Sequence, residues 1–294
     1  MDLEQIPSWS KGDLRRLGEA LVIDKAASPD GCPPYGEVML WHNELAAEVA
    51  IRIGTELLAA KPPNQLSISA RAKTIDTLVE KLQRQMTLQL GQVQDLAGVR
   101  IDAHIVLDEQ TELAQHIAEH FGADRTKIKD IRAIPHSGYR AVHVWLALPA
   151  GRVEVQIRTL AQSEWANTYE QVADLLGRGI RYGEEQQDPE DREIVRRMHA
   201  ISEFLAFSEE GINTVRRKMG AAAEGFAPLA TLRALESGLD GSTDRDELAR
   251  FLDEQVRARF AVEFEAFSNI ARLHMEPIRL LREIRRDLQE EEEV

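Results

Sequence analysis

The segment 151–159, Gly-Arg-Val-Glu-Val-Gln-Ile-Arg-Thr, combines one carboxylate with one amide and two guanidinium groups. Its polar side chains alternate with apolar ones, which predicts a β-strand with one face in the core. The polar face would then present Glu154, Gln156 and Arg158 at successive positions. Such a set could hold a metal ion and phosphate groups. For this segment alone, a solvated strand with a charged face is an alternative of equal weight.

Basic residues gather at the beginning of a second segment and continue along it. Arg71 and Lys73 lie in the sequence Arg-Ala-Lys-Thr, and Lys81 and Arg84 follow. We expect Arg71 and Lys73 at the start of a helix, where backbone amides also favour anions. The four cations could converge on a polyphosphate. The alternative for this segment alone is a solvated basic helix.

Two further segments carry candidate site residues. Asp95 directly precedes an expected strand, where its carboxylate can point into a cleft without entering the core. On its own, Asp95 would more often be a turn residue. The segment 130–143 contains Pro, Ser and Gly before Tyr139, so a loop would deliver this tyrosine to the entrance of a strand. The ring could stack on a nucleobase, although a tyrosine that caps the sheet edge is the alternative.

The spacing of apolar side chains predicts the elements that position these residues. Helical spacing occurs at four places: 41–57, 75–82, 113–121 and 165–176. Strands are expected at three: 99–105, 142–148 and 152–158. This order indicates an α/β or α+β layer, with a mixed sheet at its centre and helices packed around it.

We divide the chain into an N-terminal helical segment, a core and a C-terminal helical extension: 1–64, 65–185 and 186–294. In the extension, apolar stripes at 194–205 and 248–256 are separated by a loop rich in Gly, Ser and Asp at 237–246. Pro277 is expected to kink or end a helix. Stripes of this kind are typical of core or of a partner-facing surface rather than of catalysis.

Composition narrows the class of protein. The chain has 294 residues, of which 43% are hydrophobic, and Cys32 is its only cysteine, which excludes a disulfide framework. No apolar run reaches the length of about eighteen residues that a membrane span needs. We therefore expect a cytoplasmic protein that does not enter a membrane. The net charge of −14 argues against broad binding to a nucleic-acid backbone, but it leaves room for a local basic pocket.

The candidate segments together resemble the synthetase domain of the RelA/SpoT family, especially its small, single-function members. The family order is a basic R-x-K-S/T segment, D-x-A-G-x-R, G-Y-R-S-L-H, E-V-Q-I-R-T and a helix with a Trp. This chain has matching segments in that order at 71–74, 95–100, 138–143 and 154–159, followed by Trp165. The resemblance covers about residues 65–185 and implies an α+β, nucleotidyltransferase-like core.

The resemblance implies an enzyme that moves the β,γ-pyrophosphate of ATP to a ribose 3′-hydroxyl, which on GDP or GTP makes the alarmone (p)ppGpp. It implies that Asp95 and Glu154 hold Mg²⁺ and that Glu154 helps to deprotonate the hydroxyl. It also implies an ATP clamp formed by Arg71, Lys73, Lys81 and Arg84. The acceptor site that it implies is formed by Tyr139, Arg140, His143, Gln156 and Arg158. The chain contains no His-Asp dipeptide, so we expect no hydrolase domain.

The loop before Tyr139 departs from the family pattern D-Y-I-x-x-P-K-x-N-G-Y and is one residue shorter. Ile131 replaces the first Tyr, His136 stands near the Lys and Ser137 takes the place of Asn. The guanine nucleotides GDP and GTP remain the first choice of acceptor. The alternative is the toxic branch of small synthetases, whose members pair with antitoxins and use the 3′ CCA end of tRNA or adenine nucleotides.

A tRNA acceptor would need a confined basic patch. The candidates are Arg125, Lys127, Lys129 and Arg132, just before the Tyr139 loop, with further help from Arg178 and Arg181. A homo-oligomer is a further expectation that the resemblance brings. A different class of protein, a non-catalytic nucleotide sensor on the same fold, is less favoured because both candidate metal carboxylates are present.

Overall fold

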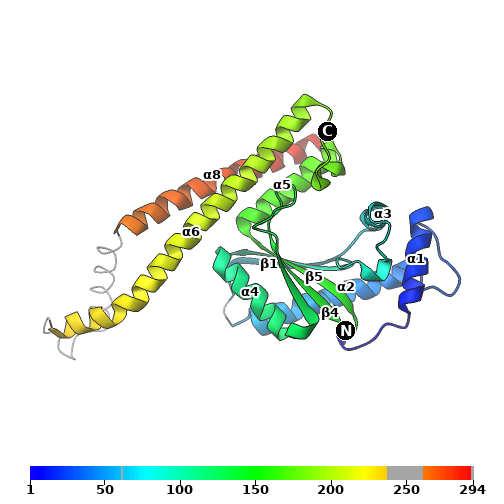
Figure 1. The fold of residues 1–294 in the computed structure, drawn as a ribbon, viewed down its shortest axis with the longest axis horizontal. Coiled ribbons are helices and arrows are strands. Elements are labelled where there is room, and N and C mark those ends of the chain that lie inside the picture. Colours follow the sequence, from blue (N-terminus) through cyan, green and yellow to red (C-terminus); the bar gives the residue numbers. More distant parts are fainter. Residues whose placement is uncertain (61, 237–260, 293–294) are drawn as a thin grey trace. The chain divides into compact units, whose positions relative to one another are not determined.

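The computed structural model describes residues 1–60, 62–236 and 261–292. The chain divides into two compact units, Met1–Ala166 and Asn167–Val294 (Figure 1). The division predicted from the sequence places its boundaries elsewhere, after residues 64 and 185, and stays a prediction.

The first unit is built on a five-stranded sheet with the order β1-β2-β5-β4-β3. Strands β2 and β5 run parallel, and the other neighbouring pairs are antiparallel, so the predicted mixed sheet of an α+β fold is confirmed. The strands are β1 (Asn64–Ala72), β2 (Ala97–His104), β3 (Thr126–Asp130), β4 (Val142–Leu148) and β5 (Gly151–Thr159).

The predicted strands correspond to β2, β4 and β5, whereas β1 and β3 were not predicted. Both missed strands lie at the edges of the sheet, where one side has no neighbouring strand and the apolar pattern is weaker. In β3 only Ile128 is apolar, and in β1 the serines Ser67 and Ser69 separate its apolar residues. Consequently Arg71 lies in strand β1 and not at a helix start, which corrects the prediction.

The helices of the first unit account for the remaining predicted elements. They are α1 (Lys11–Ile23), α2 (Tyr35–Arg52), which continues as a π-helical turn at Ile53–Leu57, α3 (Ile75–Arg84) and α4 (Leu107–His120). The short 3₁₀ turns are Leu90–Gln92 and Ala123–Arg125. Helix α5 (Leu160–Leu176) follows β5 directly and crosses the division between the units.

One face of the sheet forms the main core of the first unit. Helices α2 and α4 pack against it, and side chains such as Leu45 and Ile117 meet the fully buried Val99 and Val155 of the central strands (Figure 1). Because side chains alternate across a strand, the remaining positions of β2, β4 and β5 project from the opposite face. That face carries the candidate site residues.

The second unit is helical. After the 3₁₀ turn Arg178–Tyr182, helix α6 (Pro189–Glu236) packs against α8 (Ala261–Glu292), and Ser208 Oγ lies 2.7 Å from His274 Nδ1. Pro277 lies inside α8 and does not end it, so the helix continues despite the one lost backbone donor. The predicted stripe at 248–256 and loop at 237–246 fall outside the described residues. Among the described helices, none has the length and apolarity required to span a membrane.

Candidate active site

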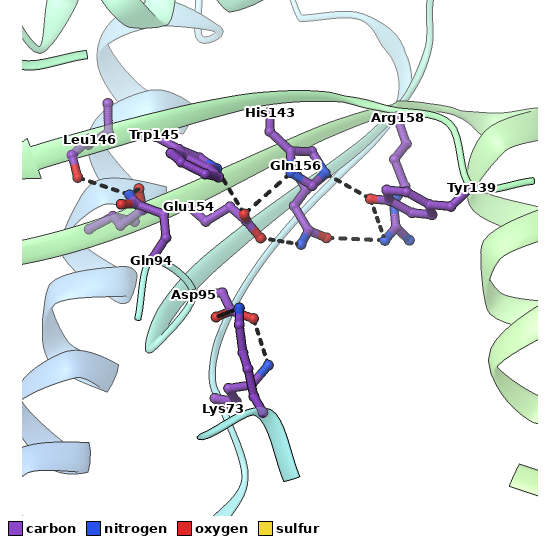
Figure 2. Close-up of polar contacts among 12 residues, drawn as sticks. Lys73, Gln94, Asp95, Tyr139, His143, Trp145, Leu146, Glu154, Gln156 and Arg158 are labelled. Atoms are coloured by element: carbon purple, nitrogen blue, oxygen red, sulfur yellow. Dashed lines mark hydrogen bonds and ion pairs between the residues drawn. The ribbon is translucent and has the colours of Figure 1, made fainter. Parts of the chain in front are cut away.

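The strand register brings the polar residues of three strands together on one face of the sheet. Position 154 of β5 lies beside Gly98 of β2 on one side and beside Trp145 of β4 on the other. The next polar position, Gln156, lies between Arg100 and His143. Segments that are distant in the chain therefore contribute to a single cluster (Figure 2).

Glu154 is almost buried, with 8% of its surface exposed, and its carboxylate accepts three hydrogen bonds. Trp145 Nε1 donates to Oε1 at 2.9 Å, His143 Nδ1 lies 3.3 Å from the same oxygen, and Gln156 Nε2 donates to Oε2 at 2.7 Å. Burial raises the pKa of this carboxyl, but the bonds from His143 and Gln156 outweigh burial and lower it. Glu154 is therefore an ionised and firmly oriented carboxylate.

Five side chains close a ring of polar contacts (Figure 2). Gln156 Oε1 accepts from Arg158 Nη2 at 3.1 Å, and the same Nη2 donates to Tyr139 Oη at 3.1 Å. Tyr139 Oη lies 3.0 Å from His143 Nε2, and His143 returns the ring to Glu154. We refer to these five residues as the polar ring. It unites one predicted catalytic residue with four of the five predicted acceptor-site residues.

The charged groups of the polar ring shift the pKa values of His143 and Tyr139. Burial lowers the pKa of His143, yet Tyr139 and Glu154 outweigh it and raise that pKa to about 9. The raised pKa favours the protonated form of His143, whose Nδ1 then donates to Glu154. Burial raises the pKa of the Tyr139 hydroxyl, but the cationic Arg158 and His143 bring it below its ordinary value.

Asp95 lies in the segment that leads into β2 and is flanked by buried residues. The amide of Gln94 is anchored to the sheet, because its Nε2 donates to the carbonyl oxygens of Leu146 and Val153 at 3.2 and 2.9 Å. Leu96 is 2% exposed within the apolar cluster formed by α1 and α3. The backbone is thus fixed on both sides while the Asp95 side chain, 21% exposed, remains accessible.

Two lysines hold the Asp95 carboxylate. Lys73 Nζ donates to Oδ2 at 2.6 Å and Lys81 Nζ donates to Oδ1 at 2.8 Å. Burial raises the pKa of Asp95, but the two ammonium groups outweigh it and lower the pKa to about 2. Asp95 also contributes a repulsive electrostatic interaction to Glu154, so the two predicted metal carboxylates are close enough to interact.

A pocket opens beside Asp95 on the same face of the sheet. Its lining combines the Asp95 carboxylate with three cations, Arg71, Lys73 and Arg100, and with the amide of Gln156. Gly98 and Val99 complete the lining. A Cβ at Gly98 would lie 3.3 Å from the Arg71 carbonyl oxygen, so glycine keeps this position open. Gly98 and Arg100 belong to the D-x-A-G-x-R motif, but their types and spacing alone indicated no role for them.

Other predicted residues lie outside the pocket lining or have structural partners. Arg84 is exposed in the last turn of α3, away from the pocket lining, whereas Arg140 Nη1 donates to the carbonyl of Arg132 in the Tyr139 loop. Tyr139 follows two residues with positive φ, Ser137 and Gly138. Its ring is covered by the guanidinium of Arg158, whose Cζ lies 5.0 Å from the ring centroid.

Most residues of the predicted tRNA patch already bind other groups of the protein. Arg132 donates to Asp130, to the Leu107 carbonyl and to side chains of α4. Arg125 forms an ion pair with Glu4, while Arg178 and Arg181 pair with Asp174 and Glu170. Lys129 Nζ lies over the ring of Trp145. Exposed Lys127 on β3 is the remaining member of the set.

The donor set fits Mg²⁺ that is bound together with a polyphosphate. In the described residues, no group of three or more His, Cys, Asp or Glu side chains could hold a metal ion. Mg²⁺ does not require one, since it is commonly held by one or two carboxylates plus substrate phosphates. Asp95 and Glu154 supply the carboxylates, and the cations of the pocket suit the phosphates.

A family model matches the part of the chain that carries this site. Residues 70–175 match the model described as "Region found in RelA / SpoT proteins". Residues 70–175 therefore form a RelA/SpoT region. The matched RelA/SpoT region contains strands β2 to β5, Asp95 and the whole polar ring.

Relatives of similar sequence occur in mycobacteria. The uncharacterized proteins Rv1366 of Mycobacterium tuberculosis and Mb1401 of Mycobacterium bovis are each 58% identical over 184 residues. The match spans 63% of this chain and 66% of each relative, slightly less than two thirds of their length.

Solved structures with similarity to this chain include small alarmone synthetase 1 from Bacillus subtilis. It is 20% identical, the match covers 64% of this chain and 98% of that one, and the TM-score is 0.49. A GTP pyrophosphokinase family protein from Streptococcus pneumoniae is 21% identical over 64% of this chain and 95% of its own, with a TM-score of 0.48.

Proposed function

We propose that this protein is an ATP-dependent pyrophosphokinase that transfers the β,γ-pyrophosphate of ATP to the ribose 3′-hydroxyl of an acceptor nucleotide. One observation carries the proposal: the RelA/SpoT region places the Asp95 carboxylate in a cationic pocket beside the oriented carboxylate of Glu154. A pocket with this mixture of charges suits a polyphosphate and a cation together.

ATP binding would redistribute the charges around Asp95. The phosphates would attract the ammonium groups of Lys73 and Lys81, with Arg71 and Arg100 contributing from the adjacent strands. Asp95 would then be released to face the cation. Bound Mg²⁺ would neutralise phosphate charge and orient the reacting groups. Lysine is suited to this exchange because its flexible stem lets one ammonium change partners.

The transfer step needs positioning and a proton acceptor more than covalent chemistry. The 3′-oxygen of the acceptor forms a bond to the β-phosphorus of ATP. The bond from that phosphorus to the α,β-bridging oxygen breaks, and AMP leaves with this oxygen. Glu154 is ionised and could take the hydroxyl proton, while its low pKa makes it a weak base, so we assign most of its effect to orientation.

The acceptor that we propose is a free nucleotide, with GDP or GTP first. Tyr139 offers a half-buried ring on which a base could stack, and the buried guanidinium of Arg158 covers one face of that ring. The internal pairing of the tRNA patch disfavours a polynucleotide acceptor. An antitoxin partner and self-association remain separate proposals that follow from the family alone.

The test is transfer of label from γ-labelled ATP to GDP, GTP, AMP or bulk tRNA in separate incubations with Mg²⁺. We expect label in GDP or GTP, and loss of transfer by orders of magnitude in Asp95→Asn and Glu154→Gln. Label in none of the acceptors, together with measurable nucleotide binding, would instead indicate the non-catalytic sensor. Amide variants are preferred because Glu154→Ala would leave three buried donors unpaired, at about 1–3 kcal/mol.

A further inference from the structure

Trp145 lies directly across the sheet from Glu154. The two residues are partners in the antiparallel pairing of β4 and β5, and the indole Nε1 donates to Glu154 Oε1 at 2.9 Å (Figure 2). The indole N–H is the only polar group of the side chain and can only donate. A tryptophan at this position therefore recognises the carboxylate form of Glu154 and limits how it can rotate.

The donors around Glu154 distinguish its two oxygens. A carboxylate offers about four acceptor positions, two on each oxygen. Oε1 receives Trp145 Nε1 and faces His143 Nδ1, so both of its positions are used. Among the described residues, Oε2 accepts from Gln156 alone. The acceptor position that remains for a cation or a substrate hydroxyl is thus on Oε2.

Trp145 is itself held by its neighbour on the edge strand. Lys129 Nζ lies 4.2 Å from the centroid of the indole ring, a cation–π contact across β3 and β4. This contact fixes the plane of the ring, and a cation above the ring also strengthens the N–H as a donor. Lys129 thus holds the Trp145 ring, and Trp145 in turn holds the Glu154 carboxylate.

We propose that Trp145 is a positioning residue for Glu154. The indole N–H of Trp145 occupies Oε1 of Glu154 and so turns Oε2 of Glu154 toward the cation and the acceptor hydroxyl. The proposal rests on the proposed function of Glu154. It assigns to Trp145 no contact with substrate. Residues that orient a ligand of a metal in this way commonly contribute about 10- to 100-fold to activity or metal affinity.

The kinetic test replaces Trp145 with Phe, which keeps an aromatic ring and removes the donor. We expect kcat to fall about 10- to 100-fold while the KM for ATP stays unchanged. The matched control is Trp41→Phe, because Trp41 Nε1 donates to the Ala150 carbonyl at 2.8 Å and has no contact with the site. Trp41→Phe should retain the kcat of the unaltered protein. Equal kcat values for Trp145→Phe and the unaltered protein would overturn the proposal.

A double-mutant cycle separates positioning from a general structural effect. If Trp145 acts through Glu154, then Trp145→Phe should cause no further loss in a Glu154→Gln background. Losses that multiply would show that Trp145 acts independently of Glu154 and would overturn the proposal. The cycle uses the residual transfer rate of Glu154→Gln as its baseline.

A spectroscopic readout does not depend on activity. In ¹⁵N-labelled protein the indole N–H signal of Trp145 is identified by its loss in Trp145→Phe. We expect Glu154→Gln, which replaces the anionic acceptor with a neutral one, to shift this signal upfield and leave that of Trp41 in place. Mn²⁺ alone should broaden the Trp145 signal before that of Trp41. A Trp145 signal that neither shifts in Glu154→Gln nor broadens with Mn²⁺ would refute the positioning role. Absence of transfer by the unaltered protein would refute only the proposed function.

Discussion

At the scale of single residues, the side chains of the polar ring are hydrogen-bond partners of one another. Each contact in the ring joins groups of complementary charge or hydrogen-bonding capacity, from Glu154 through Arg158 and back. In a network of this kind, removing one member leaves its partners unpaired, so effects extend beyond the group removed. The roles of the acceptor-site residues are therefore coupled.

The Tyr139 hydroxyl provides a test of this coupling. Stacking alone predicts that Tyr139→Phe retains most activity, because the ring is kept. In the structure the hydroxyl joins His143 and Arg158, so we expect Tyr139→Phe to raise the acceptor KM about five- to tenfold, the equivalent of ~1–1.5 kcal/mol. Tyr139→Ala should lose a further ~1–3 kcal/mol of stacking. The measurement is the acceptor KM at saturating ATP; wild-type values for Tyr139→Phe would contradict a role of the hydroxyl.

At the scale of elements, the strands with strong apolar alternation were predictable from the sequence and the edge strands were not. Buried β5 alternates Val153, Val155 and Ile157 with its site residues, and the structure confirms that strand. The mistaken helix start at Arg71 has the same origin as the missed β1: at an edge, pairing with β2 decides the conformation, and local sequence shows little of it.

The sequence indicated which residues form the site better than it indicated which contacts they make. The motifs placed Asp95, Glu154 and the acceptor residues in one site, yet the role of Trp145 depends on the β4–β5 register, and that of Arg132 depends on its contacts with α4. Register and packing between distant segments are properties of the folded sheet. Side-chain types alone could not indicate which cations were free to bind phosphate.

Gly98 shows how an element shapes the pocket. It lies between Arg71 of β1 and Glu154 of β5, and an added methyl group would press on the Arg71 carbonyl. We expect Gly98→Ala to raise the KM for ATP severalfold with little change in the acceptor KM, since overpacking costs about 1–3 kcal/mol. Gly54→Ala is the control, because its Cβ would meet Ile68 Cδ1 at an ordinary 3.5 Å. An unchanged KM for ATP would place ATP outside this pocket.

At the scale of the whole molecule, charge limits what the protein can bind. The net charge is −14, so a polynucleotide would be repelled except at a concentrated basic surface. Around the Tyr139 loop, Arg125 and Arg132 form ion pairs with Glu4 and Asp130. The described part of the first unit therefore offers a cationic pocket for a small polyanion, whereas these two arginines near the Tyr139 loop are neutralised by carboxylates.

Salt dependence should reveal this limit. Binding to a nucleic-acid backbone loses affinity with a logarithmic slope of about 0.7–0.9 per phosphate contacted, whereas a mononucleotide contacts few phosphates. We expect the KM of GDP or GTP to change little between about 50 and 200 mM salt. Lys127→Ala should behave like Lys11→Ala, a control at an exposed lysine of α1, in every transfer assay. Labelling of tRNA that falls steeply with salt and is lost specifically in Lys127→Ala would instead show that β3 receives a nucleic-acid backbone.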